Sequence, residues 1–351
     1  MTALSSPTRP ARPKDDASLR PVPWRRMAWV TWRQHRIALG GLAAFLGALA
    51  AWLWTAGLQL HHAYVAATAC HPAGSISCSD VVTRFSDMNH ALLGGYVLQP
   101  VPALIGAFVG APVLARELET GTFRYAWTQG FARWRWALAK LVTLAVVVAA
   151  AAGALSVLIS WYYQPYFATR NQAFSLPEWS PLAPPLFDLH GVAFAAWAMA
   201  AFAIGALAGM LIRWVVPAIV ASLAAYTGLA LAVGTFLRQH YMAPLVTSKL
   251  SVPGSALILS QWWTKGGKVT FGQQPPNNLL MQLCSSALRR GKPSSDSVLQ
   301  QCLAQHGYTL WTRYQPASRF WPFQWIESGW LLALSMLLIA VTIWLVRRRA
   351  V

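Results

Sequence analysis

Residues 191–237 read GVAFAAWAMAAFAIGALAGMLI-R-WVVPAIVASLAAYTGLALAVGTFL, in which Arg213 is the single charged side chain. One helix over this stretch would be roughly 70 Å long at 1.5 Å per residue, about twice the hydrocarbon thickness of a bilayer. The stretch therefore predicts two membrane-spanning helices, Gly191–Ile212 and Trp214–Leu237, joined by a tight turn at Arg213–Trp214.

The rest of the chain repeats this apolar pattern. Three further runs lack any charged residue and reach the roughly 20 residues that a crossing needs: Ile37–Leu58, Leu141–Tyr163 and Ser328–Val346. A sixth run, Ala91–Ala115, contains three prolines, which remove helix hydrogen bonds, so this span is predicted to be kinked or broken. The fold expected is an all-α integral membrane protein with six transmembrane helices.

The composition excludes a water-soluble enzyme. Only 11% of the side chains are charged while 56% are hydrophobic, and a soluble chain this poor in charge could not cover its surface. The net charge of +18 is interpreted as membrane-orienting charge, because the basic residues lie mostly beside apolar runs. Nucleic acid is therefore not an expected partner.

The distribution of Lys and Arg predicts the orientation. Residues 1–36 hold eight, the loop 116–140 holds five and the tail 347–349 holds three, whereas the loops 59–90 and 164–190 hold one each. Positive residues concentrate on the cytoplasmic side, so both termini are expected in the cytoplasm of a plasma-membrane protein. The long segment 238–327 then becomes one large extracellular loop between the spans 37–237 and the final segment 328–351, which comprises the sixth span and a basic cytoplasmic tail.

The four cysteines, Cys70, Cys78, Cys284 and Cys302, all fall in segments assigned to the outside. Oxidising exteriors permit disulfides and the cytosol does not. Four cysteines allow three connectivities, of which the simplest is local, Cys70–Cys78 and Cys284–Cys302.

The N-terminal region divides into two parts. Residues 1–22 are rich in Pro, Ser and charged side chains and are expected to form a disordered cytoplasmic tail. The segment Pro23–Arg36 carries three tryptophans and four arginines directly before the first span, which suits an amphipathic elbow helix in the membrane interface. A plain anchoring flank is the alternative.

The most informative polar stretch is Ala115–Lys140, ARELETGTFRYAWTQGFARWRWALAK. Glu117 and Glu119 continue the second span beyond the membrane, and Gly121 can end that helix. Thr122 can cap a new short helix, on which Phe123 and Trp127 share a face because they are four residues apart. The product would be a short helix along the cytoplasmic membrane surface that presents aromatic and acidic groups to a partner. The alternative is a solvated loop in which Arg116 and Arg124 pair with the two carboxylates.

A Glu-x-Glu-x-Gly-Thr element after the second of six spans, followed by an Arg and by Lys140 at the third span, resembles the permease subunits of ABC type-2 exporters. The positions that match are Glu117, Glu119, Gly121 and Thr122. The resemblance implies that this loop is the coupling helix that docks on a separate ATPase subunit, and that an amphipathic helix precedes the first span. The large loop Arg238–Glu327 has no counterpart in that family pattern.

Several absences restrict the function. The chain has no Gly-x4-Gly-Lys-Ser/Thr phosphate loop, and Gly266-Gly267-Lys268-Val269-Thr270 is only a distant approach to it, so ATP would be hydrolysed by another chain. The five clean apolar runs carry no Asp, Glu, Lys, Arg or His, which argues against a proton- or ion-driven transporter or a channel. No cofactor is expected. Spans of this kind favour an apolar or amphipathic cargo.

Two clusters contain residue types found in metal or catalytic sites, but neither pattern favours such a site. The first external loop could offer ligands for copper or zinc, but its spacings match no standard site: His61, His62, Cys70, His71, Cys78, Asp80 and His90. The last loop could offer acid–base groups, but two carboxylates in about 90 residues are few for an active site: His240, His306, Asp296 and Glu327.

The sequence therefore predicts a non-enzymatic permease subunit of an ATP-driven exporter. Six spans make half of a pathway, so the expected complex has two permease chains, identical or not, and two cytoplasmic ATPase subunits, embedded in membrane lipid. The alternatives are a non-transporting envelope scaffold or sensor and a membrane transferase acting on lipid-linked substrates. A transferase should show acidic residues clustered at one membrane face.

Overall fold

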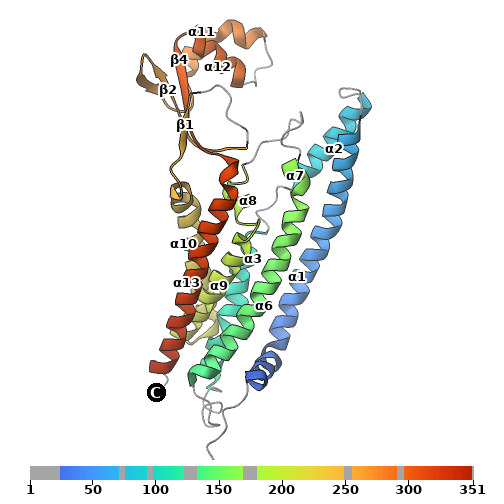
Figure 1. Ribbon diagram of the computed structural model, residues 1–351, viewed down its shortest axis with the longest axis vertical. Helices are drawn as coiled ribbons and strands as arrows, with labels where there is room; N and C mark the ends of the chain where they lie inside the picture. The colour runs from blue at the N-terminus through green and yellow to red at the C-terminus, as the bar shows by residue number, and fades with distance from the viewer. Residues whose placement is uncertain are drawn as a thin grey trace, which may run out of the picture.

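The computed structural model describes residues 24–70, 76–92, 98–121, 133–168, 180–248, 255–290 and 296–349. Within these ranges, six helical stretches are long and apolar enough to cross a membrane. They are Trp29–Ala69, Pro100–Thr120, Trp134–Tyr162, Ala193–Ile212, Val215–His240 and Ala317–Arg348. The prediction of six spans is confirmed (Figure 1).

Helix α1 (Trp24–Ala69) runs without interruption from the predicted interfacial segment through the first span. It packs against α6 (Arg133–Tyr162), while α2 (Ile76–Leu92) packs back on the last turns of α1 through Leu60, Ala67 and Phe85. An orientation of the first turns of α1 along the membrane surface stays a prediction. The predicted disordered tail, residues 1–22, lies outside the described residues.

The second span is interrupted as predicted. It consists of α3 (Pro100–Ile105), the π-helical turn η2 (Gly106–Gly110) and α4 (Pro112–Thr120). The amide of Ala111 bonds the carbonyl of Gly106 at 2.9 Å, five residues back, and Pro112 has no amide to continue the ladder. The prolines thus explain where the regular helix stops and restarts.

The predicted tight turn between the fourth and fifth spans is also confirmed. Helix α9 (Ala193–Ile212) ends at Arg213, whose φ of +65° is left-handed, and α10 (Val215–Ala232) begins after the extended Trp214. The fifth span continues beyond α10 through η4 (Val233–Leu237) and η5 (Arg238–His240).

Helix α9 occupies the centre of the bundle and contacts α3, η2, α4, α6, α10 and α13 (Phe320–Arg349). Its glycines meet the second span backbone to backbone. A Cβ at Gly205 would lie 2.2 Å from the Gly106 carbonyl oxygen, and one at Gly209 would lie 2.3 Å from that of Ala111. Small residues at this spacing let membrane helices approach closely, so the two spans form one tightly packed unit.

The all-α expectation is wrong for the large loop. Strands β1 (Leu245–Thr247), β2 (Leu257–Lys265), β3 (Lys268–Phe271) and β4 (Tyr308–Gln315) form an antiparallel sheet in the order β1-β4-β2-β3. The turn between β2 and β3 is Gly266-Gly267, and both glycines have positive φ, which a tight hairpin turn requires. The segment Gly266-Gly267-Lys268, compared above with a phosphate loop, therefore belongs to a β-hairpin.

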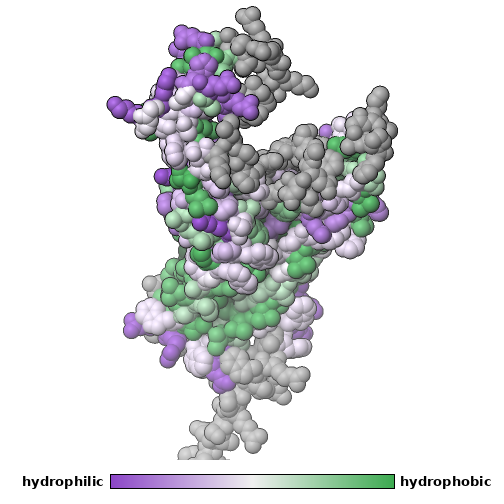
Figure 2. Space-filling view, turned by 45° about the horizontal axis from the view of Figure 1, so that its top comes forward, coloured by the Kyte–Doolittle hydropathy of each residue, from purple (hydrophilic) through white to green (hydrophobic). Residues whose placement is uncertain are grey.

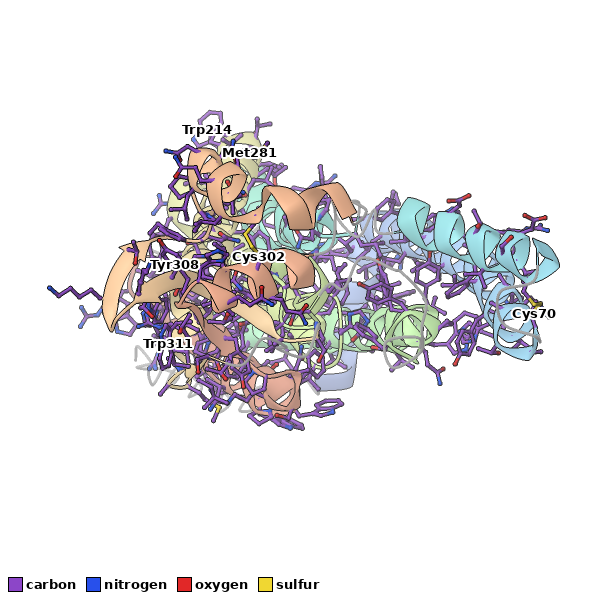
Figure 3. The ribbon with its side chains drawn as sticks, turned by 90° about the horizontal axis from the view of Figure 1, so that it is seen from above. Cys70, Trp214, Met281, Cys302, Tyr308 and Trp311 are labelled. Atoms are coloured by element: carbon purple, nitrogen blue, oxygen red, sulfur yellow. A yellow bond between two sulfur atoms is a disulfide. The ribbon has the colours of Figure 1, made fainter. Side chains whose placement is uncertain are left out.

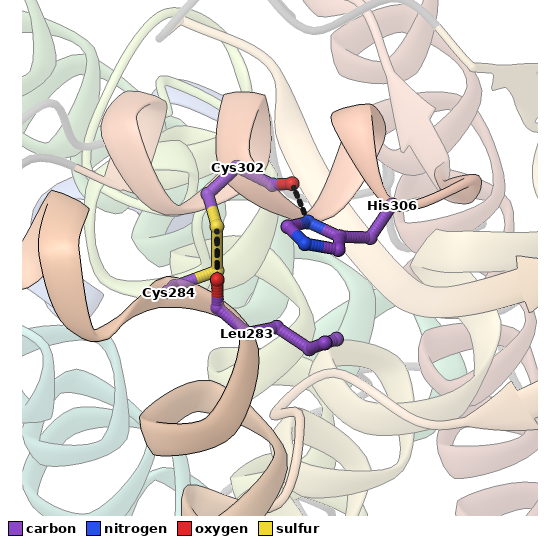
Figure 4. The surroundings of a disulfide bond; sticks show 4 residues. All are labelled: Leu283, Cys284, Cys302 and His306. Carbon is purple, nitrogen blue, oxygen red and sulfur yellow. Dashed lines mark hydrogen bonds between the residues drawn. A yellow bond between two sulfur atoms is a disulfide. The ribbon is translucent and has the colours of Figure 1, made fainter.

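Helices α11 (Asn277–Arg290) and α12 (Asp296–Gln305) pack on this sheet, and we call the whole unit, residues 245–315, the sheet module. Its small core contains Trp263, Leu303 and Tyr308 together with the Cys284–Cys302 disulfide. In Figure 4 the Cys302 sulfur also lies 3.6 Å from the carbonyl oxygen of Leu283.

Both predicted disulfides are confirmed. The Cα atoms of Cys70 and Cys78 are 5.7 Å apart, and those of Cys284 and Cys302 are 6.0 Å apart. Seen from above, Cys70 and Cys302 lie over different parts of the molecule, because one staples α1 to α2 and the other staples α11 to α12 (Figure 3).

The bundle has two distinct ends. The sheet end carries the sheet module, and the opposite end, which we call the basic end, carries the last turn of α13 with its three arginines, residues 347–349 (Figure 1). Figure 2 shows a hydrophobic band over the helices below a hydrophilic sheet module. Such a band is the surface expected of a protein embedded in lipid.

Candidate functional site

At the basic end, the structure gives Glu117 a partner inside the chain. Lys140, in the first turns of α6, donates a hydrogen bond from Nζ to Oε1 of Glu117 on α4. Only 1% of the Lys140 side chain and 14% of the Glu117 side chain are exposed. The ammonium also lies 4.9 Å from the ring centre of Trp136. This ion pair ties together the two helices that flank the predicted coupling loop.

Glu119 caps a third helix. Its Oε2 accepts a hydrogen bond of 3.0 Å from the backbone amide of Val215, the first residue of α10. A carboxylate is favourable there because the helix N-terminus carries unpaired amides and partial positive charge. The sequence alternative, in which Arg116 pairs with these carboxylates, is not what the described residues show, and Arg124 lies outside them.

Gly121 ends α4 in the left-handed conformation with φ of +69°, as its predicted role requires. Thr122, Phe123 and Trp127 lie outside the described residues. The structure thus describes the two segments that flank the predicted coupling loop, residues 117–121 and 133–140.

The sheet end holds a buried charged cluster that the sequence analysis did not assemble. Arg238, in η5, donates from Nη2 to Asp188 Oδ1 and to Glu327 Oε1, the latter at 2.8 Å. Its Nε donates to Glu327 Oε2 at 3.1 Å. The exposed fractions are 2% for the Arg238 side chain, 0% for Glu327 and 26% for Asp188. We call these three residues the charged triad.

Two aromatic residues donate further hydrogen bonds to Glu327. The indole of Trp197 donates to Oε1 at 2.9 Å and the hydroxyl of Tyr241 donates to Oε2 at 3.2 Å. The guanidinium carbon of Arg238 lies 4.3 Å from the ring centre of Phe187. Glu327 therefore accepts from three donor side chains, whereas Asp188 accepts from Arg238 and lies against the carboxyl group of Glu327.

The triad carries more negative than positive charge, with two carboxylates around one guanidinium. Burial raises the pKa of Asp188 to about 7, against the lowering effect of Arg238 and with a further upward contribution from Glu327. A surplus carboxylate at this site is therefore partly protonated near neutral pH.

Gln324 fixes the backbone on either side of Asp188. Its buried side chain on α13 donates to the Phe187 carbonyl at 3.0 Å and accepts from the Ala193 amide at 2.9 Å. Gly191 has φ of +60° and lies so close that a Cβ would come within 2.9 Å of the glutamine oxygen. The loop between α8 (Pro184–Phe187) and α9 is thereby fixed to the sixth span.

A cavity of about 450 Å³ lies beside the triad. It is bounded by α3, α9, α10 and η4 together with the loop that carries Asp188. Its lining is mainly apolar, with the rings of Phe194, Trp197 and Tyr226 on one side. This volume is in the range of sites for drug-sized ligands, about 300–1,000 Å³.

Several of the candidate metal and acid–base residues have other partners. Cys70 and Cys78 form a disulfide, and His61 Nε2 lies 3.1 Å from the carbonyl oxygen of Trp161. His240 and His306 each bond through Nδ1 to a carbonyl four residues back in their own segments. Among the described residues, no group of three or more His, Cys, Asp or Glu is placed to hold a metal.

Comparisons with known proteins give one match. A family model described as ABC-2 membrane transporter related matches residues 43–238, more than half of the chain. The matched region begins inside the first span and ends at Arg238, near the end of the fifth. No curated protein and no solved structure matches the chain.

Proposed function

The chain belongs to the ABC-2 membrane transporter related family, and from this premise we propose that it is the membrane-spanning permease subunit of an ATP-driven exporter. Its family and six membrane-competent helices support a transporter permease in a multi-pass membrane protein. A separate ABC ATPase chain supplies the energy. Two permease chains and two ATPase chains form the working complex, and the cargo is apolar or amphipathic.

The observation that carries this proposal is the set of contacts that link the end of α4, just before the loop, to α6 and α10. Glu117 is tied to Lys140 across the loop, and Glu119 is bonded to the start of α10. Displacement of the loop would therefore act directly on three spans. Helix α9 would follow, because its glycines contact the second span backbone to backbone. A loop with these connections suits the transmission of ATP-driven motion to the spans.

In the proposed arrangement the basic end faces the cytoplasm and the sheet module faces outward at the plasma membrane. The Lys and Arg excess at the basic end supports this orientation, as does the presence of both disulfides at the sheet end. Phe123 and Trp127 of the loop 122–132 then dock in a groove of the ATPase.

A pull-down from native membranes tests the docking. The affinity-tagged chain should copurify with a protein that carries a Gly-x4-Gly-Lys-Ser/Thr loop, identified by mass spectrometry. The variant Phe123→Ala/Trp127→Ala should lose most of this protein and the ATP hydrolysis that accompanies it, because buried aromatic anchors dominate interfaces. Trp344→Ala is the matched control, since Trp344 is exposed on α13 outside the loop.

The acidic residues need a separate comparison, because they have partners within the chain. Glu119→Gln keeps an acceptor for the Val215 amide and removes the charge, whereas Glu119→Ala removes both. If the Glu119 carboxylate contacts the ATPase, both variants should lose the copurifying ATPase. If Glu119 acts as a cap, Glu119→Gln retains the ATPase. Full ATPase recovery with Phe123→Ala/Trp127→Ala would overturn the docking assignment.

One observation favours the transferase alternative, since Asp188 and Glu327 come together at the sheet end of the bundle. However, both carboxylates bond Arg238, and Glu327 is fully buried among hydrogen-bond donors. A carboxylate held in this way is poorly placed to exchange protons with a substrate. The cluster therefore supports binding better than catalysis.

A further inference from the structure

The charged triad is unbalanced at the point where it meets the cavity. Arg238 and Glu327 are joined by two hydrogen bonds and are almost fully buried, and Nη1 of Arg238 has no partner among the described residues. Asp188 shares the same guanidinium, and it is the member that keeps 26% of its side chain exposed. The surplus negative charge of the triad therefore resides on the residue that lines the cavity.

The other walls contribute no opposing charge. Asp188 is the sole Asp, Glu, Lys or Arg among the residues that line the cavity, and the remaining polar groups are neutral. Trp197 and Tyr226 present aromatic rings, which attract cations through the negative faces of their π-systems. An anion would meet repulsion here, and an uncharged ligand would leave the surplus negative charge without neutralisation.

We propose that this cavity is a binding site for a hydrophobic monovalent cation, whose charge is placed beside Asp188 and whose apolar body contacts the walls formed by α3, α9 and α10. This inference rests on the proposed function and deepens it, because it assigns the cargo to amphipathic cations. A divalent metal ion does not fit, since one carboxylate among apolar walls offers too few oxygen ligands.

The position of the cavity supports entry from the membrane. Its wall includes Leu231, of which 62% is exposed on the surface of the fifth span. Hydrophobic cations partition into bilayers, so they reach such a site without crossing the sheet module. The site lies toward the sheet end of the bundle, where a cargo moving outward would leave.

The test uses tetraphenylphosphonium, a permanent hydrophobic cation without hydrogen-bond donors. Binding of the radiolabelled ion is measured by equilibrium dialysis on the full chain in nanodiscs of uncharged phosphatidylcholine, without ATP or ATPase. Saturable binding is expected. Asp188→Asn should weaken it about tenfold or more, whereas Asp80→Asn, the same charge change on exposed α2, should leave it unchanged.

Two further measurements keep the outcome decisive if Asp188→Asn folds poorly. Tetraphenylborate has the same shape with a negative charge and should compete weakly. Gly234→Leu should abolish binding without changing charge, because a Cβ there meets only the Pro184 side chain at 3.9 Å and the added atoms enter the cavity. Equal affinity for the two tetraphenyl ions, or unchanged affinity in Asp188→Asn and Gly234→Leu, would overturn the proposal.

The assay also separates this inference from the export function. Loss of the ATPase in the pull-down with intact tetraphenylphosphonium binding would count against the exporter and not against the site. Copurification of the ATPase with no binding of the cation would count against the site alone.

Discussion

The two ends of the bundle differ in how their buried charged side chains are paired. At the basic end, Lys140 and Glu117 form a one-to-one pair, and Glu119 caps a helix. At the sheet end, Asp188 and Glu327 share Arg238. The first arrangement is electrically balanced and ties helices together, whereas the second leaves a charge that a ligand can satisfy. This contrast is the reason for assigning coupling to one end and cargo to the other.

The largest expected effect follows from removing the centre of the charged triad. Arg238→Met leaves two carboxylates buried without a cation, which should lower the free energy of unfolding by about 3–5 kcal/mol. Unfolding in SDS titrations, followed by tryptophan fluorescence, measures this loss. Neutralising the carboxylates as well, in Arg238→Met/Asp188→Asn/Glu327→Gln, should recover most of it. A triple variant no more stable than Arg238→Met would mean that packing, and not charge, explains the cluster.

The balanced pair at the basic end should be less sensitive. Glu117→Gln leaves the buried ammonium of Lys140 beside a neutral amide, at a cost of about 2–3 kcal/mol, because part of Glu117 is already reached by solvent. The same SDS titration should show recovery in Glu117→Gln/Lys140→Met. If Glu117→Gln destabilises the protein more than Arg238→Met, the ranking of the two ends is wrong.

Cation binding at the sheet end should also depend on pH. The pKa of Asp188 is raised to about 7, so its ionised form dominates above that pH and its protonated form below. Tetraphenylphosphonium affinity should therefore fall about tenfold or more between pH 8.5 and pH 5.5, toward the affinity of Asp188→Asn, since the cation competes with one proton. Dialysis at a series of pH values measures this change.

The groups that face Asp188 identify the control for this profile. They are Arg238 from η5, Glu327 from α13 and Tyr226 from α10. Arginine stays charged over this range, and a tyrosine ordinarily ionises at much higher pH. Asp188→Asn retains all three, so its affinity should be low and independent of pH. A sloping profile in Asp188→Asn would show that Asp188 is not the group responsible for the pH dependence.

The sequence predicted the features that depend on local composition. Six spans follow from apolar length, the broken second span follows from its prolines, and the turn at Arg213 follows from the length of the apolar run. The disulfide pairing followed from the closeness of each cysteine pair along the chain. In each of these cases the deciding residues lie within a few turns of one another.

The charged triad could not be predicted in the same way, because its members come from three elements far apart in the chain. The helices also extend past the apolar runs, so Arg238 and Glu327 fall inside the candidate spans although the sequence placed both in the external loop. Two other features did leave a signal. Gly106 and Gly110, and Gly205 and Gly209, are each four apart, a spacing typical of close helix contacts. Gly266-Gly267 likewise predicts a hairpin.

The order of strands in the sheet module determines when that module can form during synthesis. Strands β1 and β2 both pair with β4, which is the last to be made and is followed almost at once by α13. At roughly 5–20 residues per second, β1 waits on the order of 4–14 s for its partner. During that time its exposed residues Leu245 and Val246 have no strand beside them, and the sheet closes only as the sixth span enters the membrane. The ribosome therefore finishes the sheet module and the last helix as a single late event, so any chain truncated before residue 308 lacks both the complete sheet and the sixth span.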